Sequence, residues 1–436
     1  MNRSAATEWW RPGLPDAPAA SPPTAARVQT GSETPFLALM GFTAIILLSP
    51  QTLWPGVIPS RSALLAAAVA IGAHLVDRFS RRQPIVTPTR EIRLAACLAA
   101  WAMLSVPLSY WPGGSWSLLL DLYFKTLVVF WLLSETARTR VRLRRAAWGL
   151  ALMSVPLAAT GLQNYRSGSF VREGSQAVNR ITGYEAPLTA NPNDLALVLN
   201  LIWPLVVALF LLSRRPLIRT VLLGIIVLDI VAVIVTFSRA GFLTMIAIVV
   251  LYLARLLRRP GRGWAVALAG LAILGLPLLP AGYLGHLGTI TDIDADPTGS
   301  AQLRRDDMKT AVRYVLAHPI VGAGPGQDIL ALNEMRGPRW TSVHNVYLQH
   351  AVDLGLPGLL LFLLLLARCL GNARAVRRQA ERKPEARDLF YLAEGLEMSL
   401  AGFAVAGLFY PVAYHVYFYY FGGLAVAARA AHAGGA

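Results

Sequence analysis

Four side chains stand where polar segments meet apolar ones, and their types suit one kind of chemistry. His344 ends a polar loop immediately before a long apolar run. Its imidazole, with an ordinary pKa of about 6.5, can accept a proton near neutral pH. Arg180 lies in a loop, Arg239 in a short turn and Arg304 at the start of a predicted surface helix. A guanidinium offers a planar fork of donors that pairs with phosphate oxygens, so Arg239 indicates a phosphate site. His344 indicates chemistry at the junction between water and lipid.

Each of these residues also has a plainer interpretation. Arg180 could be a solvated loop residue, and the Arg239 side chain could extend to lipid headgroups from its short turn. Arg304 and its neighbour Arg305 could do the same, since basic residues of surface helices often face headgroups. His344 could serve a purely structural role. The sequence leaves these alternatives open.

The composition is that of a membrane protein. The 436 residues are 55% hydrophobic and only 15% charged, which is typical of a polytopic membrane protein. We therefore expect an all-α polytopic fold with about twelve transmembrane helices. The stretches long enough to cross the hydrocarbon layer lie near 36–54, 62–78, 93–110, 117–134, 146–164, 194–213, 220–236, 240–254, 264–284, 345–367, 389–410 and 412–428.

The basic residues predict the side on which each loop lies. Arginines concentrate in alternate loops, at 78–93, 138–145, 214–219, 255–262 and 368–387. This positive-inside pattern predicts that both termini are cytoplasmic. The formal net charge of +16 follows from these dispersed arginines. It does not indicate nucleic-acid binding.

The chain therefore divides into tails, membrane-spanning segments and loops. Residues 1–35 contain no apolar core, so they predict a disordered cytoplasmic tail and not a cleavable signal peptide. The regions expected in order are the tail 1–35, helices over 36–164, a periplasmic loop 165–193, helices over 194–284, a large periplasmic loop 285–343, helices over 344–428 and a cytoplasmic tail 429–436.

The two large external loops hold most of the candidate site. The first contains Arg180, on the side where the positive-inside rule predicts few basic residues. In the second, LRRDDMKTAVRYVLAHP places Met308, Val312 and Val315 at helical spacing opposite a charged face, and Pro319 ends the pattern. We expect an amphipathic helix on the membrane surface.

Charged residues inside the predicted spans need partners. Asp121 and Lys125 are four residues apart, which places them on one helix face and favours an internal pair. Asp229 stands inside another span. Structural pairing is the simpler interpretation for all three, and a position near substrate is the alternative.

Three other motifs are less specific. The GAGPG segment, 322–326, imitates a nucleotide-binding loop, but it lacks the flanking strand and helix and is more simply a turn. Asp292, Asp294 and Asp296 alternate as calcium ligands can, but the segment departs from an EF-hand loop, so no metal site is expected. The aromatics of FYPVAYHVYFYYF, 409–421, predict an interfacial belt, or alternatively a surface for sugars or a long lipid.

Three segments together resemble the O-antigen ligase superfamily, which also includes O-antigen polymerases and protein O-oligosaccharyltransferases. They are VTFSRAGFL, RITGYEAPLTANPN, and LRRDDMKTAVRYVLAHPIVGAGPGQ followed by HN, nine residues and GLPG. The resemblance covers roughly residues 165–370. Met308 departs from the tryptophan expected in the amphipathic helix, which leaves open whether Arg304 or Arg305 meets substrate.

The resemblance implies a glycosyltransferase of the bacterial inner membrane. We expect it to need no metal and no cofactor, because the sequence offers no convincing ligand set outside the Asp292 cluster and arginines can replace a divalent ion at the leaving group. Such an enzyme moves a glycan from undecaprenyl pyrophosphate to lipid A-core at the periplasmic face, among membrane lipids. His344 would then act as general base, and Arg180, Arg239 and Arg304 would bind the pyrophosphate. A polymerase of O-antigen repeats, a protein O-glycosylating enzyme and a transporter or flippase for a polyprenyl-linked glycan remain alternatives.

Overall fold

The computed structural model describes residues 31–56, 58, 61–173, 176–258, 299–381 and 383–434. Its α-helices are α1 (Thr34–Leu48), α2 (Pro50–Leu53), α3 (Ser62–Ser80), α4 (Arg90–Ser105), α5 (Pro112–Leu118), α6 (Phe124–Thr136), α7 (Arg140–Ser167), α8 (Pro192–Leu212), α9 (Pro216–Val235), α10 (Arg239–Leu257), α13 (Ser300–Ala317), α14 (Asp328–Arg336), α15 (Val346–Ala380), α16 (Arg387–Ala406) and α17 (Val416–Ala433). Short 3-10 or π segments cover Val106–Leu108, Leu119–Tyr123 and Pro384–Ala386, and two strands are β1 (Phe170–Glu173) and β2 (Gln176–Ile181).

The all-α polytopic fold is confirmed. Within the ranges given above, nine helical segments are long and apolar enough to cross a membrane, and α1 is a shorter apolar helix. Each predicted span coincides with a helix, except that 264–284 lies outside the described residues. Long apolar helices satisfy their own backbone groups, which is why hydropathy alone locates them well.

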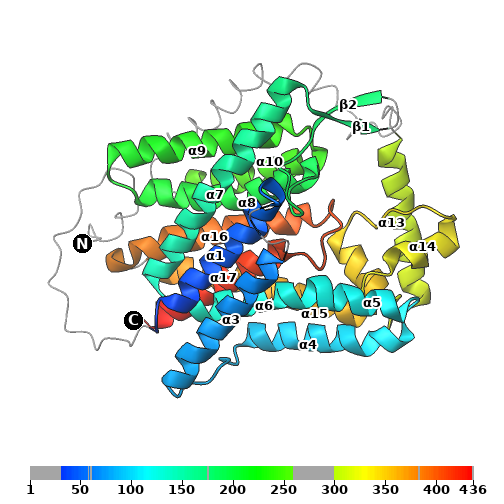
Figure 1. The fold of residues 1–436 in the computed structure, drawn as a ribbon, viewed down its shortest axis with the longest axis horizontal. Helices are drawn as coiled ribbons and strands as arrows, with labels where there is room; N and C mark the ends of the chain where they lie inside the picture. The colour runs from blue at the N-terminus through cyan, green and yellow to red at the C-terminus, as the bar shows by residue number, and fades with distance from the viewer. Residues whose placement is uncertain are drawn as a thin grey trace.

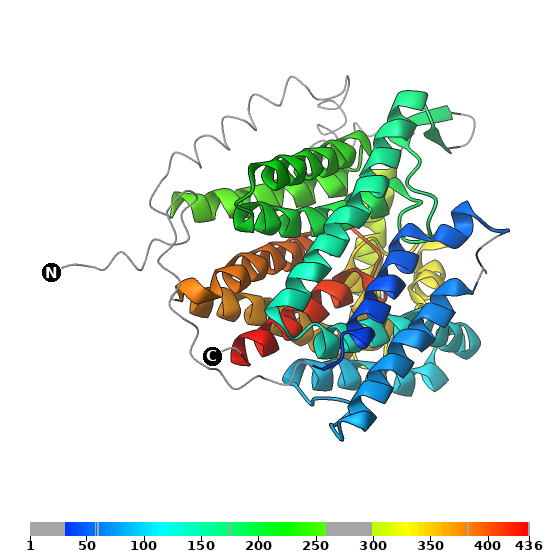
Figure 2. The same ribbon diagram turned by 60° about the vertical axis from the view of Figure 1, so that its left-hand side comes forward.

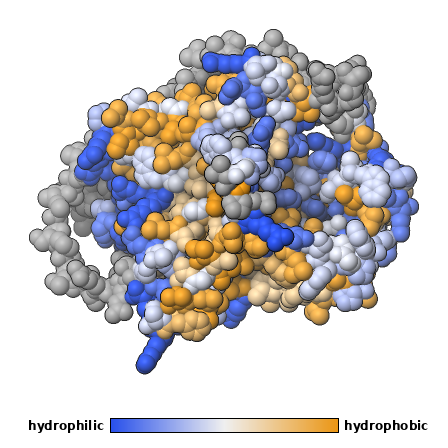
Figure 3. Space-filling view, viewed as in Figure 1, coloured by the Kyte–Doolittle hydropathy of each residue, from blue (hydrophilic) through white to orange (hydrophobic). Residues whose placement is uncertain are grey.

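The helices form a layered bundle around α16 and α17. Figures 1 and 2 show these two helices between the group α8, α9 and α10 on one side and the group α4, α5 and α6 on the other. Helices α8 and α16 are the most buried candidate spans. In Figure 3, apolar side chains cover much of the side of the bundle, and hydrophilic side chains gather toward its two ends.

One end of the bundle is held by buried ion pairs. Glu397, on α16, accepts from Arg374 and Arg377 of α15, each at 2.9 Å, and also pairs with Arg255 of α10 at 2.5 Å. Arg255 also contacts Glu394 at 3.4 Å. Because an unpaired charge is costly in a membrane, these contacts stabilise the packing of three helices at this end.

The charged residues inside the spans have two different outcomes. Asp121 and Lys125 approach to 3.9 Å, but their side chains are 74% and 53% exposed. The predicted pairing of these two residues is therefore confirmed, and the pair lies on a helix face that points away from the bundle. Asp229 is fully buried on α9 and accepts a hydrogen bond of 3.0 Å from Ser154 on α7. Its pairing is structural.

At the other end of the bundle lie the loop elements. Helix α13 runs across the ends of the long helices in Figure 1, and α14 lies beside it. The predicted helix is confirmed, but its inner face is not the expected one. Ala311, Tyr314 and Val315 pack inward with Met308 against them, whereas Val312 is 46% exposed. The reason is that the helix packs on α14 and the start of α15, so its apolar positions are divided between two directions.

The aromatic segment at 409–421 is not an interfacial belt. Tyr410, Tyr414, Tyr417 and Tyr419 are all buried in the bundle. Tyr419 donates to Tyr123 at 3.2 Å, and Tyr417 donates to the Leu188 carbonyl at 2.7 Å. The belt prediction fails because this part of the chain lies at the centre of the bundle and not at its margin, a relationship that periodicity does not reveal.

Candidate functional site

His344 lies in a short polar segment between α14 and α15, and the backbone on both sides of it is fixed. The buried Asp328 carboxylate accepts hydrogen bonds from the Val343 amide, at 2.9 Å, and from the Ser342 hydroxyl. On the other side, Asn345 caps α15 by accepting a backbone hydrogen bond of 3.0 Å. The His344 imidazole is therefore attached to a stretch of backbone whose position is set by Asp328 and Asn345.

The start of α15 is set by a break in that helix. Gly355 has a φ of 67°, a left-handed conformation that favours glycine and interrupts the helix. The break exposes two carbonyl groups, and the GAGPG turn satisfies them. Ala323 donates to the Val352 carbonyl at 2.7 Å, and Gly324 donates to the Asp353 carbonyl at 2.8 Å. The GLPG and GAGPG motifs thus form one interlocked unit.

The Asp353 side chain completes this unit. Its carboxylate is fully buried and accepts backbone hydrogen bonds from Gly326 at 2.9 Å and Gln327 at 3.1 Å. The Tyr414 hydroxyl donates to the same carboxylate at 3.0 Å. These contacts join the loop before α14, helix α15 and the segment before α17. GAGPG is therefore a structural turn, as the sequence indicates.

Arg180 and Arg239 are brought together through a shared amide. Arg180, near the end of β2, donates to the Asn193 side-chain oxygen at 2.7 Å, and the Ser238 hydroxyl donates to the same oxygen at 2.7 Å. Ser238 caps α10, whose first residue is Arg239. Phe237, just before this cap, has a φ of 52°, a left-handed conformation that makes the turn between α9 and α10 tight. Asn193 thus links the two segments that carry these arginines.

Arg304 completes the cluster with His344. Arg304 is half-buried on α13 and lies close enough to His344 to lower the pKa of the imidazole, whereas Arg305 is exposed. Arg304 and Arg180 also both act electrostatically on Tyr410. Arg304 therefore lies within electrostatic reach of both His344 and Tyr410, and Arg180 lies within reach of Tyr410. The structure favours Arg304 over Arg305 as the residue that faces the site.

The environment of His344 makes it neutral over a wide pH range. The pKa of the imidazole is lowered to about 4, mainly by burial and also by Arg304 and Arg336, with the Ser342 backbone partly offsetting them. The Nδ1 atom is buried and makes no hydrogen bond of normal geometry within the part of the chain that the structure describes. A neutral imidazole with an open nitrogen can accept a proton from a substrate.

Tyr410 was not predicted as a site residue. It lies in the segment between α16 and α17 and is 1% exposed. Burial raises the pKa of its phenol, Asp194 acts in the same direction, and Ser238 and the two arginines partly offset them. The one signal that could have found it is weak, namely a tyrosine followed by proline at the turn between two apolar helices.

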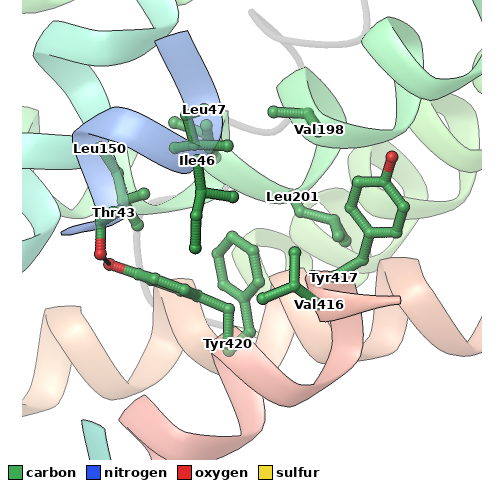
Figure 4. Close-up of a pocket in the computed structure, with 11 residues that line it drawn as sticks. Thr43, Ile46, Leu47, Leu150, Val198, Leu201, Val416, Tyr417 and Tyr420 are labelled. Atoms are coloured by element: carbon green, nitrogen blue, oxygen red, sulfur yellow. Dashed lines mark hydrogen bonds between the residues drawn. The ribbon is translucent and has the colours of Figure 1, made fainter. Parts of the chain in front are cut away.

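An apolar pocket lies deeper in the bundle. It is lined by α1, α7, α8 and α17, and Figure 4 shows Ile46, Leu150, Val198 and Val416 around it. The only hydrogen bond drawn there joins Thr43 to Tyr420 at 3.2 Å. Its lining residues include no Asp, Glu, His, Lys or Arg, so this pocket suits hydrocarbon and not proton transfer.

No group of three or more potential metal ligands occurs in the ranges that the structure covers. The segment with Asp292, Asp294 and Asp296 lies outside those ranges. Two buried acidic residues beside the His344 segment and the GAGPG turn, Asp328 and Asp353, accept hydrogen bonds from the chain itself.

Comparison with known proteins gives one family. Residues 224–363 match the family model described as O-Antigen ligase. No curated protein matches the chain. The matched segment runs from α9 into α15, so it contains Arg239, Arg304 and His344, and it excludes Arg180 and Tyr410. Together with the membrane-spanning helices, the match indicates a membrane glycosyltransferase of the O-antigen ligase or polymerase type. The segment that carries Arg239, Arg304 and His344 is therefore similar to the O-antigen ligase family.

Proposed function

We propose that this protein transfers O-antigen polysaccharide from undecaprenyl pyrophosphate to a hydroxyl of lipid A-core, at the periplasmic face of the bacterial inner membrane. The observation that carries the proposal is that Arg304 acts electrostatically on His344 and, together with Arg180, on Tyr410. The two ends of the described chain support the periplasmic placement of this site. In Figure 1 the start of α1 and the end of α17, which we expect to be cytoplasmic, lie at the end of the bundle opposite α13 and α14.

The chemistry needs few catalytic groups. The acceptor hydroxyl attacks the anomeric carbon of the glycan, a carbon–oxygen bond forms, and the bond from that carbon to the pyrophosphate oxygen breaks. The hydroxyl proton passes to His344, and the electron pair of the broken bond leaves with undecaprenyl pyrophosphate. Because negative charge develops on that leaving group, Arg180, Arg239 and Arg304 would stabilise the transition state. The proton on His344 then returns to solvent.

The geometry supports separate roles for the arginines. Arg180 and Arg239 are joined through Asn193 and Ser238, so they would hold the pyrophosphate from one side. Arg239 is also the first residue of α10, and the amide groups at a helix N-terminus favour an anion. Among the charged residues, Arg304 has the largest effect on the pKa of His344. It would therefore bind the pyrophosphate next to the base that activates the acceptor hydroxyl.

The test is His344→Ala in a strain that carries only the variant. For the proposed ligase, the acceptor lipid stays bare while long glycan accumulates on the polyprenyl carrier outside the inner membrane. A gel of surface glycolipid is read beside an analysis of carrier-linked glycan. Asn372→Ala, on the part of α15 beyond its break, is a control that leaves the His344 segment intact.

Other outcomes identify the other candidate functions. A polymerase defect would leave lipid capped with a single repeat, and this result would contradict the ligase assignment while keeping the role of His344. A flippase defect would trap carrier-linked sugars on the cytoplasmic side. A normal glycolipid ladder would contradict the role of His344 itself.

A further inference from the structure

We infer that Tyr410 is a further substrate-binding residue, whose hydroxyl donates a hydrogen bond to the phosphate group held by Arg180 and Arg304. The inference rests on the proposed function and extends it, because Tyr410 lies outside the segment that matches the family model. Its chemical partner is a phosphate oxygen of a pyrophosphate.

The first observation is an unsatisfied donor. Tyr410 is 1% exposed, and its hydroxyl makes no hydrogen bond of normal geometry with any residue that the structure describes. The Ser238 hydroxyl lies beside it and acts on the Tyr410 phenol, but the two groups do not meet in normal hydrogen-bond geometry, and Ser238 donates to Asn193 and accepts from the Gly241 amide at 3.1 Å. Leaving a buried hydroxyl unpaired is unfavourable, so such a group calls for a partner that binds from outside.

The second observation is the charge around this hydroxyl. Arg180 approaches from the β-hairpin and Arg304 from α13, and both act on the Tyr410 phenol. Two cations from separate elements make the space that the hydroxyl faces a place for an anion. A neutral hydroxyl among them can add a hydrogen bond without adding charge, and hydrogen bonds to charged groups are the stronger ones.

The third observation is that the tyrosine is held in place. The Asn345 side chain donates to the Leu408 carbonyl at 3.4 Å, and Gln349 accepts from the Ala413 amide at 3.1 Å. Both contacts come from the first turns of α15, next to His344. The segment with Tyr410 is therefore fixed to the same unit that positions the general base, which suits a binding residue.

A comparison within the same segment shows why Tyr410 differs from its neighbours. The hydroxyl groups of Tyr414, Tyr417 and Tyr420 all have partners within the chain, namely Asp353, Leu188 and Thr43. Those three hydroxyls stabilise the fold. The Tyr410 hydroxyl contributes no such contact, so its removal is not expected to weaken the fold.

The experiment compares Tyr410→Phe with Tyr420→Phe, each as the full chain purified in detergent. Binding of inorganic pyrophosphate is measured by calorimetry, and the thermal midpoint is measured in parallel. We expect Tyr410→Phe to bind pyrophosphate about 10-fold or more weakly with an unchanged or higher thermal midpoint, since the lost hydrogen bond is to a charged group. Tyr420→Phe removes a paired hydroxyl, so it lowers the midpoint and keeps the affinity.

Two results separate this inference from the proposed function. Normal pyrophosphate affinity in Tyr410→Phe would overturn the role of Tyr410, even if the wild-type protein transfers glycan. Weakened binding by Tyr410→Phe with no glycan transfer by the wild type would support the phosphate contact and contradict the transfer reaction.

Discussion

The Asp328 carboxylate accepts a hydrogen bond of 2.9 Å from the Val343 amide, one residue before His344. Asp328 opens α14 and is buried, and its pKa is raised mainly by burial, which the hydrogen bonds and Arg336 only partly offset. It therefore holds the chain just before the proposed base without reaching the substrate itself. It is a positioning residue.

We expect Asp328→Ala to impair turnover more than Asp328→Asn. The alanine variant leaves the buried Val343 amide and the Ser342 hydroxyl without an acceptor, at a cost of about 1–3 kcal/mol in the free energy of unfolding. Asparagine keeps an acceptor oxygen at that place. The measurement is kcat and KM for each variant beside its thermal midpoint. Equal turnover of both variants would show that the position of His344 does not depend on Asp328.

The pH dependence of transfer reports the His344 environment. The general base must be neutral, so activity is present above its pKa and lost as pH falls through it. With a pKa of about 4 in the free enzyme, the acidic limb of kcat/KM should lie near pH 4 instead of near 6.5. The acidic limb of the kcat profile should lie at higher pH than that of kcat/KM. The bound pyrophosphate is anionic, so it stabilises the protonated imidazole and raises the pKa of His344 in the complex.

Arg304→Gln supplies a second test of the same pair. Arg304 lowers the pKa of His344, so its removal should move the acidic limb of kcat/KM to higher pH. Arg305→Gln is the matched control, since Arg305 is exposed on the same helix. An identical shift in both variants would mean that general charge, and not proximity to His344, sets the pKa.

The sequence predicted the helices well because each long apolar stretch must satisfy its backbone within itself. It also predicted which arginines and which histidine to examine. It could not predict the β-hairpin from Phe170 to Ile181, whose strands are short and pair across a register irregularity. Nor could it predict that Arg180 and Arg304 both act electrostatically on Tyr410, since these residues are far apart in the chain.

We expect transfer to continue in a chelator such as EDTA, because the arginines can neutralise charge on the leaving group. The measurement is the initial rate before and after exhaustive chelation. Loss of activity that one added cation restores would contradict this prediction. Asp292→Ala and Asp294→Ala would then be the variants to compare.

Membrane sidedness is open to a direct test. Reporter fusions should place residues 165–190 and 285–343 outside and residues 368–388 inside. The buried pairs of Glu397 with Arg374 and Arg377 would then lie toward the cytoplasm, where the positive-inside rule expects the arginines. A cytoplasmic report from a fusion at residue 320 would rule out a periplasmic active site.

The clamp formed by Arg180 and Arg239 should depend on the guanidinium and not only on its charge. Lysine keeps the charge but loses the planar fork, so it cannot donate to Asn193 and to a phosphate in the same way. Removing one preorganised donor from a developing anion costs on the order of 100-fold in kcat, so we expect losses of roughly 10- to 100-fold in each Lys variant. Arg166→Lys, in the last turn of α7, is the matched control for a conservative change in the same region. Turnover is compared with protein level and thermal midpoint, so that misfolding is separated from lost chemistry. If both variants at positions 180 and 239 transferred glycan at the wild-type rate in well-folded protein, the paired arginines would have no role in holding the pyrophosphate.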